Sequence, residues 1–146
     1  MPRPGTRPVT ETDDIRHVLL DLDTWAVVGC SPDPSRDSHG VARFLMGKGK
    51  IVVPVNPAAA EILSVPCYPD LATAAAVHVA GVDVVDVFRR ADEAGRHVDE
   101  AIEIGAKAVW MQLGVIDEAA AERARAAGLI VVMDRCPKIE FPRLAT

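Results

Sequence analysis

The sequence predicts a single-domain α/β fold with a doubly wound, five-stranded parallel sheet in the order 3-2-1-4-5. Its 146 residues leave room for one compact domain. Five short apolar runs are spaced along the chain, and helical patterns lie between most of them. Strands that alternate with helices are joined by right-handed crossovers, which build a parallel sheet. Ligands bind such sheets at the carboxyl ends of the strands, so we expect the functional residues in the loops that follow the five strands.

The N-terminal segment precedes the sheet. Residues 1–9 contain three prolines, and we expect a flexible arm there because little in it can be buried to offset the entropy of ordering. Residues 10–146 then form the domain. Its first element is an entry helix over 10–22, in which four apolar residues recur at helical spacing behind Thr and Asp residues that can cap the first turn.

Five runs have the apolar character of strands covered on both faces, and they span residues 24–28, 51–55, 82–87, 106–111 and 129–133. Helical patterns follow the first, third and fourth of them. Glycines lie where these helices should stop, at positions 49, 105 and 128, and Asp117 lies where the last helix should be capped. The second crossover, 56–81, contains three prolines, which leave room only for a short helix near 71–76.

The composition restricts the partners of the protein. The chain has 16 Lys and Arg residues against 21 Asp and Glu residues, and a net charge of −5 excludes the broad basic surface of a general nucleic-acid binder. No apolar run reaches the ~18 residues that span a bilayer, and the N-terminus has no signal-peptide core. The three cysteines are widely spaced and indicate neither a disulfide framework nor a zinc site. We expect a cytoplasmic protein that binds no nucleic acid, membrane or metal, and the apolar strand edges leave a homodimer open.

The loop after the first strand has the composition of an anion site. Gly29 permits a tight turn, and Cys30 follows it. Ser31 and Ser35 offer hydroxyl groups and Arg36 offers a planar set of donors, directly before a helix. The alternative is that the serines and aspartates of this loop only form turns and cap the helix. The position of the loop, where the strand order reverses, favours binding.

The other four loops add groups that suit a nucleotide-like ligand. In chain order they contribute Asn56, Phe88 with Arg89, Gln112 with Gly114, and Cys136. An amide suits a ribose or an adenine edge, and an aromatic ring beside a guanidinium group suits a flat base and phosphates. The alternatives are a turn former at Asn56, a core ring at Phe88 and a helix-capping charge at Arg89. An NAD(P)-dependent oxidoreductase stays an alternative function, although the first loop lacks Gly-x-Gly-x-x-Gly and the second strand does not end in an acidic residue.

Together, these segments resemble the small CoA-binding proteins whose Rossmann-like domain is shared with the CoA-binding part of the succinyl-CoA synthetase alpha chain. The resemblance covers about residues 24–143, and its carriers lie at 28–32, 54–57, 86–90, 109–114 and 133–137. It implies that the ligand is coenzyme A or an acyl-CoA. It further implies phosphates near Gly29, Ser31, Ser35 and Arg36, an adenosine portion beside Asn56, Phe88 and Arg89, and a pantetheine arm toward Gln112, Gly114 and Cys136.

The sequence contains no recognisable catalytic set. Of the four histidines only His39 lies in a strand-end loop, where a capping or solvent-facing role is favoured. We therefore expect non-catalytic binding of a CoA thioester. A second alternative is a thiol redox switch, in which Cys30 or Cys136 forms a mixed disulfide with CoA because a thiol at a helix start is activated. The competing interpretation of both residues is an inert buried thiol.

Overall fold

Five parallel strands form the centre of the structure, a computed structural model that describes residues 11–144. They are β1 (Thr24–Val28), β2 (Ile51–Val55), β5 (Val84–Val87), β6 (Ala108–Met111) and β7 (Ile130–Met133). The strands pair in the order β2-β1-β5-β6-β7, and every neighbouring pair is parallel. The predicted fold class, a Rossmann-like α/β fold around a five-stranded parallel sheet, is confirmed. The arm predicted for residues 1–9 lies outside the described residues.

The strand order differs in one place from the predicted 3-2-1-4-5, because the third sheet strand, β5, pairs with β1 instead of lying outside β2. Pro54 supplies a physical reason. Its carbonyl accepts from the Tyr68 N–H on the outer side of β2, so its missing N–H falls on the side where a further strand would need a donor. Both orders place the reversal of strand order beside β1, and this reversal is the feature on which the site depends.

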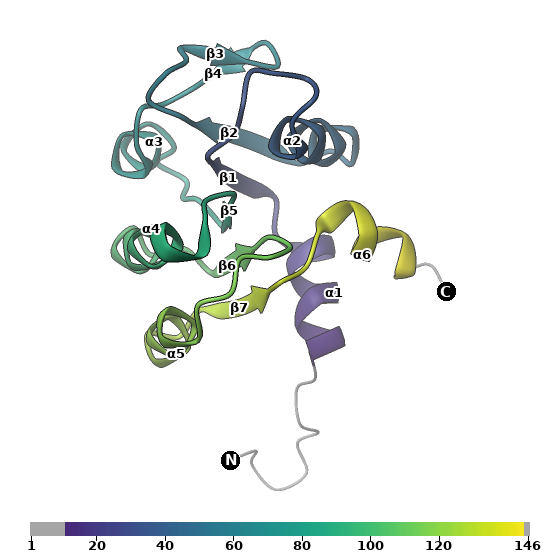
Figure 1. Cartoon of the computed structure of the whole chain (residues 1–146), viewed down its shortest axis with the longest axis vertical. Coiled ribbons are helices and arrows are strands. Elements are labelled where there is room, and N and C mark those ends of the chain that lie inside the picture. Colours follow the sequence, from purple (N-terminus) through teal and green to yellow (C-terminus); the bar gives the residue numbers. More distant parts are fainter. Residues whose placement is uncertain (1–10, 145–146) are drawn as a thin grey trace, which may run out of the picture.

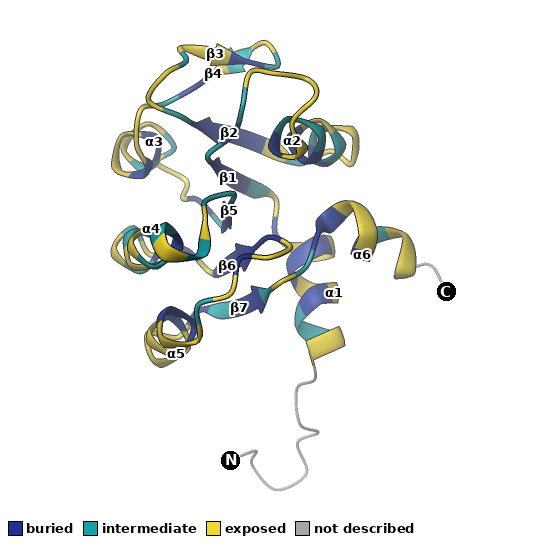
Figure 2. Cartoon of the chain, viewed as in Figure 1, coloured by how far each residue is buried: buried dark blue, intermediate teal, exposed yellow. Residues whose placement is uncertain are grey.

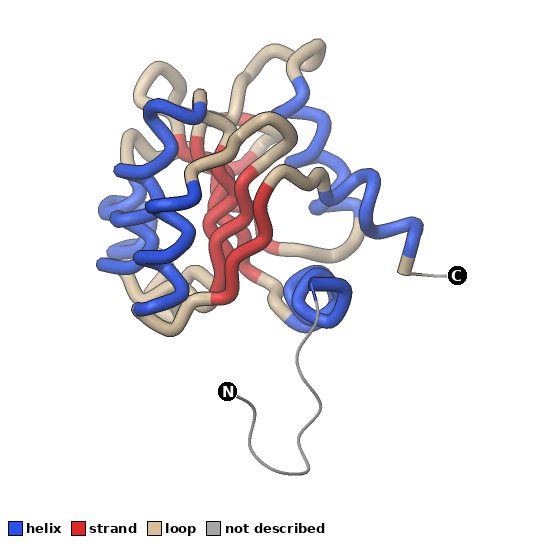
Figure 3. The backbone as a smooth tube through the Cα atoms, turned by 60° about the horizontal axis from the view of Figure 1, so that its bottom comes forward, coloured by secondary structure: helices blue, strands red, loops and turns tan. Residues whose placement is uncertain are grey.

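Within residues 11–144, six helices cover the two faces of the sheet (Figure 1). One face carries α1 (Glu11–Asp21), α2 (Asp37–Gly47) and α6 (Pro137–Arg143), and the other carries α3 (Leu71–Val77), α4 (Ala91–Glu103) and α5 (Glu118–Ala126). Figure 3 shows these two layers with the sheet, seen edge-on, between them. No helix among residues 11–144 is long and apolar enough to cross a membrane.

The core consists of two apolar clusters, one on each face of the sheet. The strands are buried and the outer helix surfaces are exposed, as Figure 2 shows. The cluster under α1, α2 and α6 contains Trp25 and Trp110, which are fully buried with ring centroids 5.7 Å apart. The cluster under α3, α4 and α5 relies on alanine, whose small side chain lets these helices approach the sheet closely.

Two features, a hairpin and a helix, are absent from the sequence-based prediction. The second crossover contains a hairpin of β3 (Glu61–Ile62) and β4 (Val65–Pro66), and its turn residues Leu63 and Ser64 have φ angles of 55° and 65°. Non-glycine residues with positive φ are uncommon, so no turn was expected from this dipeptide. The other is α6, whose seven residues include prolines at its start and near its end.

Candidate functional site

The five strand-end loops lie together at the carboxyl edge of the sheet (Figure 3). Two cavities open there, on opposite faces. The larger has a volume of about 460 Å³ and lies between α2, α6 and the ends of β5 and β6. Of the predicted site residues it brings together Ser35, Arg36, Phe88, Gln112 and Cys136. The smaller, of about 240 Å³, lies between the ends of β1 and β2 and helices α3 and α4, and it brings together Gly29, Asn56 and Arg89.

The amino end of α2 forms one wall of the larger cavity. Arg36 is its N-cap residue, with an extended backbone and no side-chain hydrogen bond to the first turn. The N–H groups of that turn are therefore not capped by the Arg36 side chain, and they carry the partial positive charge of the helix amino end. Because Arg36 and Asp37 both line the cavity, the open helix end and a guanidinium group meet at the same place. This arrangement suits an anion.

The hydroxyl groups of the same loop are used within the loop. Ser31 Oγ accepts from the Asp33 N–H at 3.0 Å, and Ser35 donates to Asp33 Oδ1 through both its N–H and its hydroxyl. The backbone and side-chain hydrogen bonds from Ser35 lower the pKa of Asp33. The turn-forming alternative therefore describes these serines well. Arg36 and the open end of α2 are the parts of this loop that stay available to a ligand.

Gln112 is the most deeply buried polar side chain in the larger cavity. The residue is 6% exposed, and its Oε1 has no hydrogen-bond partner among the described residues. Cys136 lines the same cavity at 9% exposure. Gly114 lies outside both cavities. Its N–H donates to Asp134 Oδ1 at 2.8 Å and ties the fourth loop to the fifth.

The smaller cavity is more strongly charged than the sequence indicated. Arg96, His97 and Glu100 of α4 line it together with Arg89, and Asp70 adds a second carboxylate. Asn56 uses its amide to join two loops, donating to the Cys30 carbonyl and accepting from the Ala58 N–H. Arg96, His97 and Glu100 belong to a helix, and in a sequence nothing distinguishes a helix face that lines a cavity from a solvated surface.

Phe88 is separated from the residues with which it was predicted to bind, and Cys30 lies in the core instead of the predicted site. Phe88 was grouped with Asn56 and Arg89, but its side chain lines the larger cavity whereas the other two line the smaller. Cys30 is fully buried and lines neither cavity. Burial, with Cys67 and Asp86 nearby, raises the pKa of the Cys30 thiol to about 12, so this thiol is both shielded and protonated at neutral pH.

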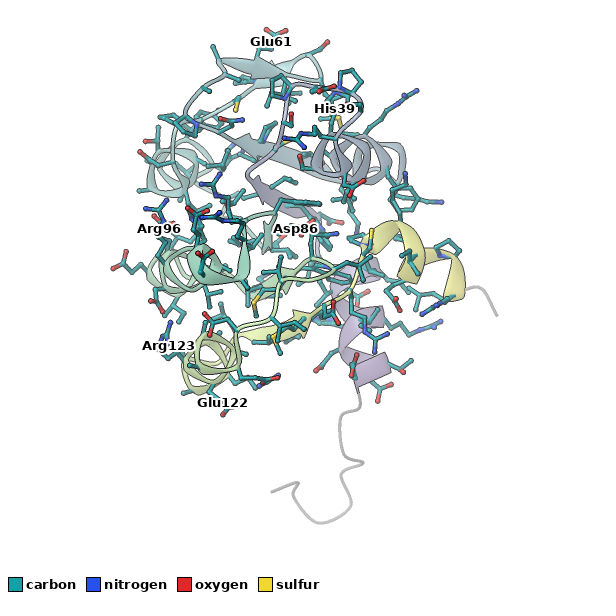
Figure 4. The ribbon with its side chains drawn as sticks, in the orientation of Figure 1. His39, Glu61, Asp86, Arg96, Glu122 and Arg123 are labelled. Carbon is teal, nitrogen blue, oxygen red and sulfur yellow. The ribbon has the colours of Figure 1, made fainter. Side chains whose placement is uncertain are left out.

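Asp86 is the buried acid that sequence reasoning missed. It lies in β5 between Val27 and Trp110, is fully buried, and neither of its carboxyl oxygens has a hydrogen-bond partner among residues 11–144. Figure 4 shows it inside the molecule. Burial raises the pKa of Asp86 well above its usual value. It lines neither cavity, so it belongs to the core beneath the site.

A parallel sheet whose order reverses beside an open helix end, with a cavity on either side, defines a Rossmann-like ligand-binding protein. Residues 23–142 match the CoA binding domain family. The chain therefore belongs to this family, which supports CoA binding in general.

Three relatives are similar over most of the chain. YneT of Bacillus subtilis is 33% identical over 127 residues, which cover 86% of this chain and 90% of YneT. The structure of a hypothetical protein from Pyrococcus horikoshii is 36% identical over 100% of both chains, with a TM-score of 0.84. A structure from Thermus thermophilus is 30% identical over 91% of this chain and 98% of its own, with a TM-score of 0.78.

Proposed function

We propose that the protein binds coenzyme A or an acyl-CoA across the carboxyl edge of its sheet, without a catalytic step. The observation that carries the proposal is the pair of cavities on either side of the reversal in strand order, with the open amino end of α2 at the larger one. Gly29 lies at their boundary: it lines the smaller cavity, and a Cβ atom at this position would lie 2.7 Å from the carbonyl oxygen of Phe88, which lines the larger. A long ligand with an anionic middle suits this shape.

The residues present fit the parts of CoA. Its pyrophosphate lies beside Arg36 and the N–H groups of α2 in this proposal. The pantetheine arm lies in the larger cavity, whose apolar walls include Val41 and Ile139. There Gln112 Oε1, an acceptor without a partner, receives an amide N–H of the arm. The adenosine portion lies on the side of Asn56 and Arg89.

Substitution of Arg36 tests the proposal. Micromolar binding needs about 8 kcal/mol net, and one charge-assisted hydrogen bond contributes about 1.5–3 kcal/mol. We expect Arg36→Ala to weaken CoA binding about tenfold or more in calorimetry. Arg43→Ala is the matched control, because Arg43 is exposed on the same helix and lines neither cavity. Equal CoA affinity in wild type and Arg36→Ala would remove the open end of α2 from the site.

Thermal shifts separate CoA from other nucleotides. A ligand that binds only the folded state raises the melting temperature, and at equal concentration a tighter ligand raises it more. We expect CoA to stabilise the protein more than NAD, NADP or ATP at equal concentration. Stabilisation by NAD alone would instead favour the nucleotide-dependent oxidoreductase.

A thiol switch is the second candidate function, and the position of Cys136 in the wall of the larger cavity favours it at that residue. In this reaction the Cys136 thiolate attacks the disulfide of oxidised CoA, a mixed disulfide forms, and one CoA thiolate leaves. Intact mass spectrometry after incubation with oxidised CoA should show one added CoA, and Cys136→Ser should abolish it. An adduct that persists in Cys136→Ser, or no adduct in wild type, would exclude this function.

A further inference from the structure

The smaller cavity holds polar nitrogens that its own residues leave unused. Arg89 Nε and His97 Nε2 are buried and have no hydrogen-bond partner among the described residues, and both side chains line the cavity. Arg96 lines it too, and it forms no hydrogen bond or ion pair with any residue of the range 11–144. A guanidinium group only donates, so the buried Arg89 Nε requires an acceptor that the described residues do not supply, and the exposed Arg96 offers further donors at the same cavity.

The carboxylates around the cavity are already engaged. Asp70 caps α3 by accepting from the Thr73 N–H at 2.7 Å, and Glu100 Oε1 lies 2.6 Å from His97 Nδ1. Glu93 contacts Arg89 through Nη2 at 3.3 Å and leaves Nε free. Glu93 and Glu100 therefore contact Arg89 and His97 without occupying Arg89 Nε or His97 Nε2.

We propose that Arg89, Arg96 and His97 bind the phosphate monoester on the ribose of the nucleotide ligand, and that they make the protein select ligands that carry this group. Phosphate oxygens accept several charge-assisted hydrogen bonds at once, which matches two guanidinium groups around one recess. His97 Nε2 supplies a third contact, to the phosphate or to the adjoining ribose hydroxyl. Arg96 lies on the outer part of α4, where an entering ligand can reach it (Figure 4).

This inference rests on the proposed function and adds a second anion site to it. The first anion site, at Arg36 and the end of α2, borders the larger cavity, and the second borders the smaller one across Gly29. Coenzyme A carries two separate anionic groups, a pyrophosphate and a ribose 3′-phosphate, whereas 3′-dephospho-CoA and NAD carry only the pyrophosphate. Two anion sites on opposite faces of one sheet edge therefore favour the doubly anionic ligand.

Calorimetric titration with CoA and with 3′-dephospho-CoA tests the inference. We expect wild type to bind CoA about tenfold or more tightly than 3′-dephospho-CoA. Arg96→Gln should weaken CoA binding and leave 3′-dephospho-CoA binding unchanged, so that the ratio of the two affinities falls toward one. Arg90→Gln is the matched control, because Arg90 is 77% exposed, lines neither cavity and changes the net charge equally. Its affinity ratio should equal that of wild type.

The outcomes separate this inference from the proposed function. If wild type binds CoA and 3′-dephospho-CoA equally well, the phosphate subsite is excluded while CoA binding stands. An affinity ratio that Arg96→Gln leaves unchanged also excludes the subsite. If wild type binds neither ligand, both proposals fail. Because Arg96 is exposed, we expect Arg96→Gln to unfold at the wild-type temperature. An unchanged unfolding temperature would show that the lost preference for CoA over 3′-dephospho-CoA is not a folding defect.

Discussion

At the scale of single residues, Gly29 determines whether the loop after β1 can approach the end of β5. Its φ is +84°, and a Cβ atom there would lie 2.7 Å from the Phe88 carbonyl oxygen and 3.0 Å from Arg89 Cδ. A side chain would therefore meet backbone that cannot move without shifting β5. We expect Gly29→Ala to lower the free energy of unfolding by about 2–4 kcal/mol, from the left-handed backbone and the contact combined.

Urea unfolding followed by circular dichroism measures this loss. Gly49→Ala is the matched control, because Gly49 also has a positive φ, of 83°, but a Cβ there would meet nothing within 4 Å. It should lose only the backbone part, about 1 kcal/mol. Equal losses in the two variants would show that the contact with Phe88 costs nothing.

Single residues also show how far a sequence predicts a site. Arg36, Gln112 and Cys136 were predicted because each lies just after a strand, and parallel strands end at one edge. They share one cavity in the structure. Arg96 and His97 were missed because they lie within a helix, and their approach to the cavity depends on how α4 packs against α3. Chain order contains no signal of that packing.

At the scale of elements, Asp117 fixes the start of α5. Its side chain accepts from the Ala120 N–H at 3.0 Å, as expected of an N-cap residue. We expect Asp117→Ala to reduce the free energy of unfolding by about 1 kcal/mol. Glu118→Ala, one residue later and exposed, should cost only a few tenths of a kcal/mol. Denaturant unfolding of both variants tests this difference, and equal losses would mean that the cap is unimportant.

The β strands were easier to predict than their arrangement. The predicted ranges 24–28 and 51–55 coincide with β1 and β2, because continuous apolar runs are typical of strands covered on both faces. The position of β2 at the edge was not predicted, although Pro54 carries the signal. Its missing N–H is tolerated at an edge and excluded from a central ladder. The Tyr68 contact and the hairpin of β3 and β4 lie beside that edge.

At the scale of the whole molecule, Asp83, just before β5, and Asp86, within it, make the free energy of unfolding depend on pH in opposite directions. Burial opposes the charge of Asp83, but hydrogen bonds from the Thr24 and Asp23 N–H groups and from Lys107 outweigh it and lower the pKa of Asp83. Asp83 is therefore ionised in both states above about pH 5, and its contribution is lost only in acid. Asp86 differs, because burial raises its pKa well above the usual value.

The raised pKa of Asp86 predicts that the protein loses stability as the pH rises. Above the ordinary pKa of 3.8, the unfolded chain releases the Asp86 proton while the folded chain retains it. The free energy of unfolding therefore falls by up to about 1.4 kcal/mol per pH unit until the folded pKa is reached. Asp86→Asn removes this dependence, since an amide stays neutral. We expect the stability of wild type relative to Asp86→Asn to decrease between pH 5 and pH 7 in urea unfolding, while its stability relative to Asp83→Asn stays constant. If the wild-type and Asp86→Asn stabilities change in parallel over this range, the buried carboxyl group is not protonated in the folded protein.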